Sequence, residues 1–278
     1  MTENQPEVEA ILSALNHPQH IQKVVSESLI LTGGAAAILL QIAHPAVAKG
    51  VNNHSSFATR PVDRLRTTMT YVYGMLFASP AEKKKIIELV HRAHETVKGE
   101  GYTADDPAAQ LWVAATLYAV GIELYEQVFG EMSEDVAEET YREYVVLGAS
   151  LRVPVEMWPR DRAAFWAYWD EQLAGFEICD EARNVARDLL FNSRLPLWMK
   201  GLMPMVRLVT GELLPEKLRG EYGLKRSKGR KRMYKGTMVV TKGVYPFVPR
   251  VVRTWPVRFY MRDMRRRMAK YGVGQLKI

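Results

Sequence analysis

The sequence predicts an all-α fold, with one multi-helix domain over residues 1–215 and a loosely structured basic C-terminal region over residues 216–278. Apolar residues recur at helical spacing through most of the chain, and prolines and glycines stand where helices typically begin and end. No segment alternates strictly enough between apolar and polar residues to indicate a sheet. The hydrophobic share of 47% and the charged share of 25% are those of a folded protein.

The first expected helices are bounded by prolines and turn residues. They cover residues 6–16, 22–42, 61–77 and 80–97. Pro45 should restart the chain as a new helical piece, because proline cannot donate the backbone bond of a helix interior. The segment NNHSSFATRP, residues 52–61, is rich in turn residues and is expected as a loop. Within 61–77 one apolar stripe is formed by residues spaced four, three and four apart: Leu65, Met69, Val72 and Leu76.

The helix expected at 105–130 should lie at the centre of the fold, because its middle is apolar almost all round. Asp105 or Asp106 can cap it, Pro107 suits its first turn, and Gly130 suits its end. Further helices are expected at residues 133–150, 159–175 and 179–192. No internal repeat and no low-complexity segment is evident.

Prolines break the chain after residue 193 into short pieces, and Ser227 to Lys235 is expected as a loop. The overall net charge of +7 conceals an asymmetry. The segment 217–278 holds 19 Lys and Arg and two acids, a net charge of +17, whereas residues 1–216 carry a net charge of −10. A basic region of this kind is typical of contact with an anionic membrane surface or with nucleic acid.

The sequence also gives indications of the cellular compartment of the protein. Cys179 is the only cysteine, so an intrachain disulfide is excluded, and a structural thiol is favoured over a nucleophile. The N-terminal 20 residues lack the basic and apolar regions of a cleaved signal peptide, which favours an intracellular location. The apolar stretch 29–48 is long enough to span a membrane, but its glycines, Gln41, His44 and Pro45 favour a core helix pair.

Two of the six histidines lie three residues apart on the helix expected at 80–97. His94 falls within the apolar stripe of Ile86 and Val90, and His91 lies at its boundary. No HExxH, CxxC or carboxylate-rich helix pair accompanies them, so a zinc or di-iron site is weakly supported. One histidine on an apolar face suits an axial haem ligand, but on periodicity alone a core histidine bonded to a backbone carbonyl is favoured.

Several motifs in order resemble the MpaB / rubber oxygenase catalytic-domain family. The first, at residues 31–74, reads LTGGAAAILLQIAHPAVAKGVNNHSSFATRPVDRLRTTMTYVYG. It is followed by HETVKG at 94–99, DDPAAQLWVAATL at 105–117 and YREYVVLG at 141–148. The resemblance covers roughly residues 28 to 200 and implies a helical domain around a haem b pocket. It implies an oxidoreductase that cleaves double bonds of isoprenoids or related natural products with dioxygen.

The resemblance also implies residue roles. His94, in the position of the family's H-x-x-V-x-G histidine, would be the proximal iron ligand and so the metal-binding residue. Arg64 and Thr68, the pair of the Arg-x-x-x-Thr motif, would line the haem pocket and take part in catalysis, with Arg64 positioned to meet a propionate. His91 is expected beside them in the cofactor-binding set. From the residues alone, a surface arginine paired with Asp63 would be the simpler reading of Arg64.

The sequence departs from the family at two positions. Latex-clearing proteins carry lysine where this chain has Thr67, and many relatives carry histidine at the position of Ala114. His44 and His54 are therefore the candidates for a distal, proton-handling residue, with His44 beside the helix break at Pro45. Apolar surface for a substrate is expected from Met69, Met75, Phe77 and Trp112.

Three functions from different classes remain open on sequence alone. The first is a haem-dependent oxygenase with an apolar substrate, and the second is a haem- or lipid-binding protein without turnover. The third is a helical interaction protein without metal. The segment 249–278 combines aromatic and cationic residues, which suits contact with an anionic membrane surface. No nucleic-acid motif is found, so nucleic acid is the weaker candidate partner, and a tail packed on the acidic body is the third alternative.

Overall fold

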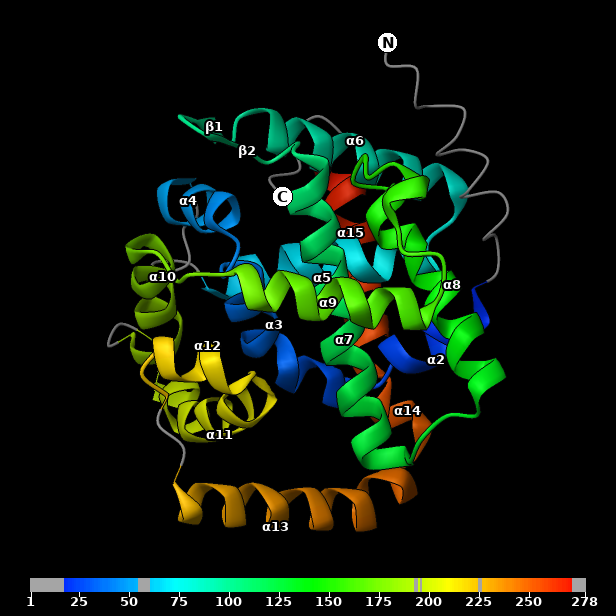
Figure 1. The fold of residues 1–278 in the computed structure, drawn as a ribbon. Coiled ribbons are helices and arrows are strands. Elements are labelled where there is room, and N and C mark those ends of the chain that lie inside the picture. Colours follow the sequence, from blue (N-terminus) through cyan, green and yellow to red (C-terminus); the bar gives the residue numbers. More distant parts are fainter. Residues whose placement is uncertain (1–17, 55–60, 193–194, 196, 225–226, 272–278) are drawn as a thin grey trace.

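The computed structural model describes residues 18–54, 61–192, 195, 197–224 and 227–271, and within these ranges the chain is almost entirely helical, which confirms the all-α class (Figure 1). The α-helices are α2 (Gln19–Val25), α3 (Gly34–Gln41), α4 (Pro45–His54), α5 (Pro61–Phe77), α6 (Pro80–Glu95), α7 (Pro107–Phe129), α8 (Glu134–Ala149), α9 (Arg162–Gly175), α10 (Asp180–Phe191), α11 (Leu197–Leu213), α12 (Glu216–Glu221), α13 (Lys228–Val244), α14 (Arg250–Arg253) and α15 (Trp255–Tyr271). Three 3-10 helices join them: η1 (Ser28–Gly33), η2 (Val155–Met157) and η3 (Tyr245–Phe247). The helix expected at 6–16 and most of the loop expected at 52–61 lie outside the described residues.

Helix α7 forms the centre of the molecule, as its apolar composition predicts (Figure 1). Asp106 caps it by accepting a hydrogen bond from the backbone N–H of Ala109 at 2.8 Å, and Gly130 ends it at a φ of +91°. The Trp112 side chain is fully buried and donates to the Leu40 carbonyl at 2.7 Å, which joins α7 to α3. Aromatic rings from α8 and α9 pack around Tyr118.

The chain between residues 22 and 42 is not the single helix that the sequence predicted. It divides into α2, η1 and α3, with a bend of 66° between α2 and the η1–α3 piece. Glu27 adopts an extended backbone at the break, and its buried carboxylate forms an ion pair with Arg253 at 2.9 Å. This long-range ion pair, which a local pattern cannot reveal, stabilises the break. Pro45 restarts the chain as α4, as expected.

The helices predicted around the two histidines are confirmed. Ser79 and Glu82 form a capping box at the start of α6, and Pro61 occupies the first position of α5. The glycines that follow α6 belong to a hairpin of β1 (Lys98–Gly99) and β2 (Tyr102–Thr103), which pair antiparallel around Gly101 at a φ of +75°. This hairpin lies beside α4 at the top of the molecule in Figure 1.

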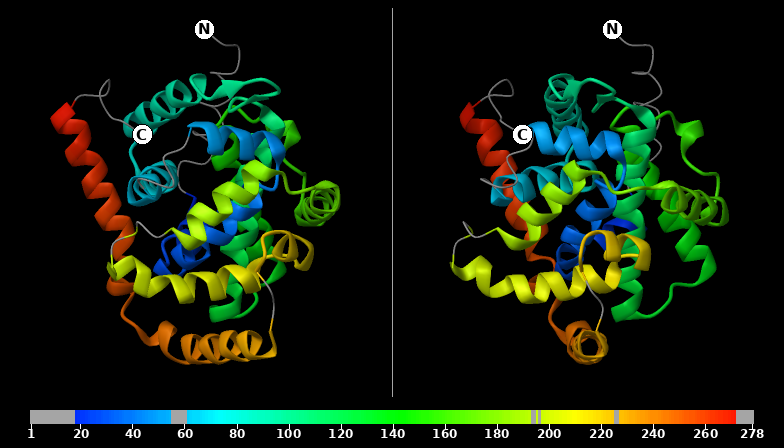
Figure 2. Two further views of the ribbon diagram at one scale, coloured as in Figure 1. Left: turned by 90° about the vertical axis from the view of Figure 1, so that its left-hand side faces the viewer. Right: turned by 60° about the vertical axis from the view of Figure 1, so that its left-hand side comes forward.

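The loop expected at 227–235 is wrong, because this segment forms the first half of α13. Ser227 caps the helix by accepting from the Arg230 N–H at 3.1 Å, and Tyr234 is buried with its hydroxyl donating to Gln127 of α7 at 2.6 Å. Packing against α7 thus overrides the loop-like glycines and charges. Figure 2 shows α13 along the lower edge of the molecule and α15 along one side. The division of the chain into two domains at residue 215 stays a prediction.

By length and composition alone α7 could cross a membrane, and α2 with η1–α3 could do so as a bent pair. The apolar window of α7 is 78% buried inside the fold, so core packing already accounts for its composition.

Candidate functional site

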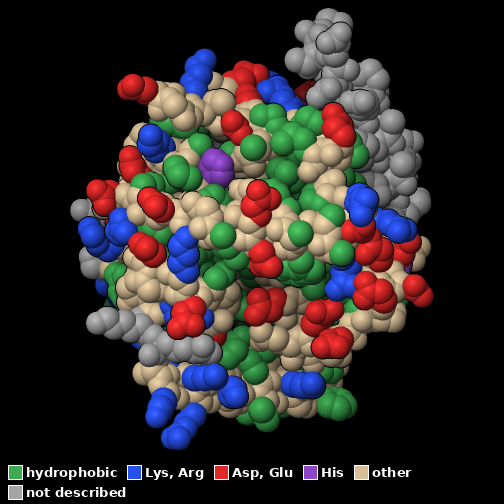
Figure 3. Space-filling model, in the orientation of Figure 1, with side chains coloured by type: hydrophobic (Ala, Val, Ile, Leu, Met, Phe, Trp, Pro, Cys, Tyr) green, Lys and Arg blue, Asp and Glu red, His purple; other side chains and the backbone are tan. Residues whose placement is uncertain are grey.

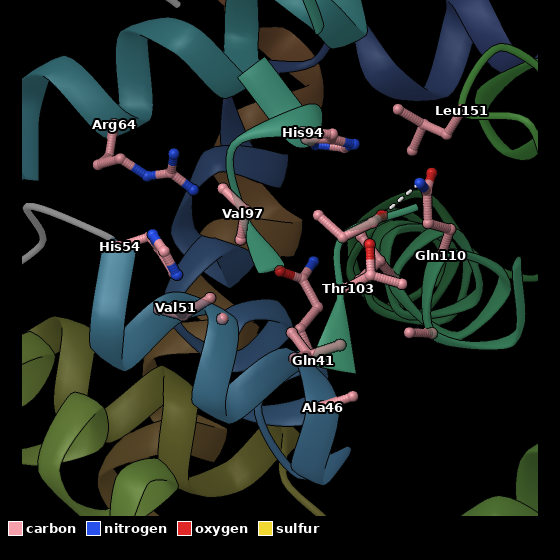
Figure 4. A pocket seen from close by; sticks show the side chains of 15 residues that line it. Gln41, Ala46, Val51, His54, Arg64, His94, Val97, Thr103, Gln110 and Leu151 are labelled. Atoms are coloured by element: carbon pink, nitrogen blue, oxygen red, sulfur yellow. Dashed lines mark hydrogen bonds between the residues drawn. The ribbon is translucent and has the colours of Figure 1, made fainter. Parts of the chain in front are cut away.

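A cavity of about 210 Å³ lies between α4, α5, α6, the start of α7 and the hairpin (Figure 4). We call it the histidine cavity. Its walls are mostly apolar, and one side is open to solvent. The polar side chains on its walls are few: Gln41, His54, Arg64, His94, Thr103 and Gln110. A mainly apolar concavity with a few convergent polar groups is the usual form of a small-molecule site.

His94 reaches this cavity from the last turn of α6. Its Nδ1 atom is buried and has no hydrogen-bond partner among the described residues. Burial lowers the pKa of the imidazole, and Asp105 opposes this shift only in part. The ring is therefore neutral at physiological pH, and a buried nitrogen without a partner is energetically unfavourable unless a ligand or metal meets it.

Arg64 enters the same cavity from α5. Figure 4 shows its guanidinium extending into the hollow, on the same side as His54. Burial lowers the pKa of Arg64, but an arginine stays protonated at any physiological pH. Arg64 therefore brings a positive charge to the cavity wall, where it suits a carboxylate.

Thr68 follows Arg64 by one helical turn and lies outside the lining of the histidine cavity. Its hydroxyl donates to the Arg64 carbonyl at 3.1 Å, and the neighbouring Thr67 donates to the Asp63 carbonyl at 2.8 Å. Both hydroxyls thus bond to the backbone of their own helix. The sequence pair Arg64 and Thr68 is brought to the same helix face, but only Arg64 contacts the cavity.

His91 also lies outside the cavity lining. Its Nε2 atom is 3.0 Å from the Ser150 carbonyl oxygen, so the ring joins α6 to the end of α8. Burial and then the nearby charge of Arg152 lower the pKa of His91, and the bond to the Ser150 carbonyl opposes this shift only in part. The two histidines of α6 therefore face different surroundings, one a cavity and the other a carbonyl.

His44 and His54, the two candidates for a distal residue, are also separated. His54 lines the cavity, is exposed, and its Nε2 atom is 3.0 Å from the Tyr102 hydroxyl of the hairpin. His44 lies just before α4, with its ring edge-on to Phe176 and its Nδ1 buried without a partner among the described residues. Burial lowers the pKa of His44. Of the two, His54 is the one on the cavity wall.

Sequence reasoning missed Gln110 as a cavity residue. This side chain is buried, donates from Nε2 to the Ala104 carbonyl, and leaves Oε1 without a hydrogen-bond partner in the described part of the chain. Gln110 lies within the DDPAAQLWV motif, one turn after the cap of α7. A buried glutamine so close to a helix cap is a usable signal, because it needs partners that a helix interior does not offer.

A second, almost wholly apolar cavity of about 70 Å³ lies next to the first, and we call it the apolar cavity. Three helices contribute neighbouring turns to both cavities. In α7 the pair is Val113 and Leu117, and in α3 it is Gln41 and Ala37, with the first of each pair in the histidine cavity. Leu151, just beyond the end of α8, and Leu147, in its last turn, repeat the pattern. Because four helical residues rise about 6 Å, the two cavities are adjacent along these helices.

The apolar wall expected from four side chains is distributed differently in the structure. Met69 lines the apolar cavity, whereas Met75 and Trp112 are fully buried in the core and Phe77 packs against it. Ala114 is also fully buried. The histidine cavity instead takes its apolar walls from Val47, Val51, Val97 and Val113.

One family model and two curated relatives match the chain. Residues 22–243 match the family model described as the ER-bound oxygenase mpaB/B′/rubber oxygenase catalytic domain. The "uncharacterized protein Mb2261" of Mycobacterium bovis and the "uncharacterized protein Rv2237" of Mycobacterium tuberculosis are each 30% identical over 249 residues. Each alignment covers 86% of this chain and 97% of the relative. No solved structure matches the chain.

Proposed function

The chain belongs to the mpaB/rubber oxygenase catalytic-domain family, and we propose that it is a haem b-dependent oxygenase of an apolar substrate. The proposed reaction is oxidative cleavage of a carbon–carbon double bond in an isoprenoid or a related natural product. The observation that carries the proposal is the buried, partnerless nitrogen of His94 on the wall of a cavity that also receives Arg64. An oxygenase family and an all-α fold provide the setting.

The donor set fits a haem better than a bare metal ion. Among the described residues no group of three or more His, Cys, Asp or Glu side chains is placed to hold a metal. A haem needs only one strong protein ligand, and a neutral imidazole is its commonest axial ligand. Burial keeps His94 neutral, so its ring nitrogen is available for an iron atom.

The remaining walls fit the other parts of the cofactor. Arg64 would hold a propionate carboxylate, since a guanidinium binds a carboxylate through two parallel hydrogen bonds. The cavity volume of about 210 Å³ is below the roughly 300–1,000 Å³ of typical ligand sites, but the open side leaves room for a group that protrudes. The valines of the wall would exclude water from the ring face.

Haem, when bound, would supply the oxygen chemistry, while the protein supplies binding, orientation and a dry environment. Gln110 would direct its partnerless Oε1 toward a hydrogen-bond donor on a ligand. His54, whose Nε2 atom lies 3.0 Å from the Tyr102 hydroxyl, is the second imidazole on the wall and would hold or pass a proton. The apolar cavity next door would suit the apolar part of the substrate.

One specific observation favours a second candidate function, a haem- or lipid-binding protein without turnover. Two positions that carry titratable side chains in many relatives hold Thr67 and Ala114 in this chain. The Thr67 hydroxyl is bonded to the backbone, and Ala114 is fully buried, so neither can handle a proton. The two candidates share the His94 site and differ in turnover.

The first test is the absorption spectrum of the purified protein, reconstituted with haem where necessary. We expect a Soret band that His94→Ala abolishes or shifts strongly, because the mutation removes the axial ligand. His20→Ala, on α2 and away from the cavity, is the matched control and should leave the band unchanged. A protein that takes up no haem, or a Soret band indifferent to His94→Ala, overturns the proposed cofactor site.

The second test separates an enzyme from a binder. Haem-loaded protein is incubated with a panel of isoprenoids under oxygen, and the products are identified by mass spectrometry. Oxygen-dependent cleavage products that disappear in Arg64→Ala would support the oxygenase. Haem loading without any product across the panel would favour the binding protein.

A further inference from the structure

One segment of the surface combines exposed apolar side chains with an unusual excess of positive charge. Between Glu221 and Asp263 the chain has no acidic residue, and this stretch includes α13, η3 and α14. Its exposed large apolar side chains include Val239 at 71% and Phe247 at 84% of full exposure. A monomeric protein rarely leaves a run of such side chains in water unless something covers them.

The exposed side chains of α13 include two lines of residues that run along the helix. Met233, Val240 and Val244 are spaced seven and four residues apart, so these exposed side chains lie along one side of the helix. Three exposed lysines recur at every seventh residue and form a second line: Lys228, Lys235 and Lys242. The buried Tyr234 faces the body. At about 100° per residue the two lines lie on opposite flanks of the helix, each roughly 100° from Tyr234, and the exposed Val239 lies between them on the outward side.

The apolar line continues beyond the end of α13. Phe247 of η3 and Val251 and Val252 of α14 are all more than half exposed. Figure 1 shows α13 along the bottom of the molecule with α14 following at its end, and Figure 3 shows hydrophobic and basic side chains together along this edge. We call this surface, from Lys228 to Val252, the α13–α14 face.

The basic residues of α15 are engaged in a different way. Arg265 contacts Glu82 at 2.8 Å, and Arg267 contacts Asp263 at 3.0 Å and Thr70 at 2.9 Å. These contacts attach α15 to α5 and α6. Lys228, Lys235 and Lys242 are exposed and form no ion pair among the described residues, so their charge is available to an external partner.

We propose that the α13–α14 face docks on an anionic membrane surface, with Val240, Val244 and Phe247 inserted among the lipids and the lysine line against the headgroups. An amphipathic helix with lysines beside aliphatic and aromatic residues has the chemistry of an interfacial helix. Nucleic acid would favour aromatic stacking platforms over aliphatic side chains. A second copy of the chain would meet the same positive charge, which disfavours self-association.

Binding of the full-length protein to vesicles of phosphatidylcholine mixed with phosphatidylserine tests the charge. We expect Lys235→Ala/Lys242→Ala to weaken binding by about thirty-fold, from the usual contribution of each cation at an anionic surface. The control Arg262→Ala/Arg266→Ala removes the same charge from exposed positions of α15 and should weaken binding less than about three-fold. Equal losses in both variants would overturn the assignment to this face.

Val240→Ser/Val244→Ser tests the apolar line. These side chains are exposed, so the variant should fold, and we expect weaker vesicle binding with little change in net charge or thermal midpoint. Unchanged vesicle binding would overturn insertion. If the protein binds duplex or single-stranded nucleic acid more tightly than vesicles, the partner of this face is nucleic acid and not a membrane. If the protein forms dimers that this variant dissociates, the partner is a second copy of the chain.

A gain of signal provides a measurement that does not depend on loss of binding. Phe247→Trp places an indole at the most exposed point of η3. Vesicles with brominated acyl chains should quench this added fluorescence on binding, beyond the quenching of the unmodified protein. Absence of extra quenching in bound protein would place Phe247 outside the lipid and contradict the proposal. None of these measurements involves haem, so they can fail or succeed independently of the proposed oxygenase function.

Discussion

Helix α15 and the α13–α14 face have similar basic sequences but opposite relations to the rest of the fold. Arg265 of α15 and Arg253 of its neighbour α14 form ion pairs with carboxylates of the acidic body, and Arg267 of α15 pairs with Asp263 of its own helix. The α13–α14 face has apolar and cationic side chains directed outward. Composition alone could not separate the two, because the difference depends on which acids lie opposite. One part of a basic segment can therefore form ion pairs within the fold while another part forms the proposed docking surface.

The largest effect should come from the buried ion pair behind the docking face. Arg253 contacts Glu27 at 2.9 Å, and its guanidinium also lies 5.2 Å from the ring centre of Phe129. Arg253→Ala leaves the Glu27 carboxylate buried with only neutral hydrogen-bond donors, so we expect a loss of about 3 kcal/mol in the free energy of unfolding. Denaturant unfolding measures it. Arg250→Ala, an exposed residue of the same helix, is the control, and a similar loss there would contradict the distinction.

A smaller loss of stability is expected when the ion pairs that attach α15 to α5 are weakened. Asp263 accepts hydrogen bonds from Arg66 at 2.7 Å and from Arg267 at 3.0 Å. Asp263→Asn removes the negative charge between the two arginines, and a loss of about 1–2 kcal/mol in unfolding free energy follows. The same variant should leave vesicle binding nearly intact, because α15 is not part of the proposed docking surface. A strong loss of vesicle binding would mean that α15 takes part in docking, which would contradict the distinction between the two regions.

Lowering the pH should weaken the ion pair between Glu82 of α6 and Arg265 of α15. Hydrogen bonds from Arg265 lower the pKa of Glu82 to about 2, below its ordinary value of 4.5. A carboxylate with a lowered folded-state pKa stabilises the fold fully above the ordinary value and loses this contribution as pH falls toward about 2. Urea midpoints measured through this range should fall more steeply for the wild type than for Glu82→Gln, which retains the capping box. Parallel slopes would exclude this carboxylate from acid unfolding.

The smallest effect on stability is expected on the docking face itself. Lys235→Ala removes an exposed charge without a described ion pair, so the unfolding free energy should change by less than about 0.5 kcal/mol. Vesicle binding should nevertheless weaken. Lys235→Ala should therefore weaken binding without destabilising the fold. A loss of more than about 1 kcal/mol in unfolding free energy would contradict this prediction.

The sequence predicted the helices whose ends carry their own signals. Ser79 with Glu82, and Asp106, satisfy backbone N–H groups at the starts of α6 and α7. Pro61 removes one such donor at the start of α5, and Gly130 adopts the positive φ that ends α7, so these limits follow from a few residues. The break at Glu27 was missed because its partner, Arg253, lies 226 residues away. Helix α13 was missed although Lys-Gly recurs at 228–229, 235–236 and 242–243, a seven-residue spacing that suits a helix better than a loop.

The candidate site was predictable in part. The apolar stripe places His94 on an inner face, and the structure puts it on a cavity wall with Arg64. His91, three residues away, turns instead to the Ser150 carbonyl, a partner supplied by a distant helix. Gln110 entered the site unpredicted for a similar reason, since its position depends on how α7 meets the hairpin. Side-chain direction depends on tertiary contacts that spacing does not encode.

Helix α7 also fixes how far the two ends of the molecule stand apart. Val113, near its start, lines the histidine cavity, whereas Phe129, at its end, contacts Tyr245 of η3 beside the docking face. Sixteen helical residues separate these positions, a rise of roughly 25 Å. A headgroup layer is only about 5–8 Å thick, so a molecule resting on its α13–α14 face would hold the histidine cavity above the lipids, in water. A lipid-soluble substrate would then have to leave the bilayer to reach the cavity, and its extraction would become a step in turnover.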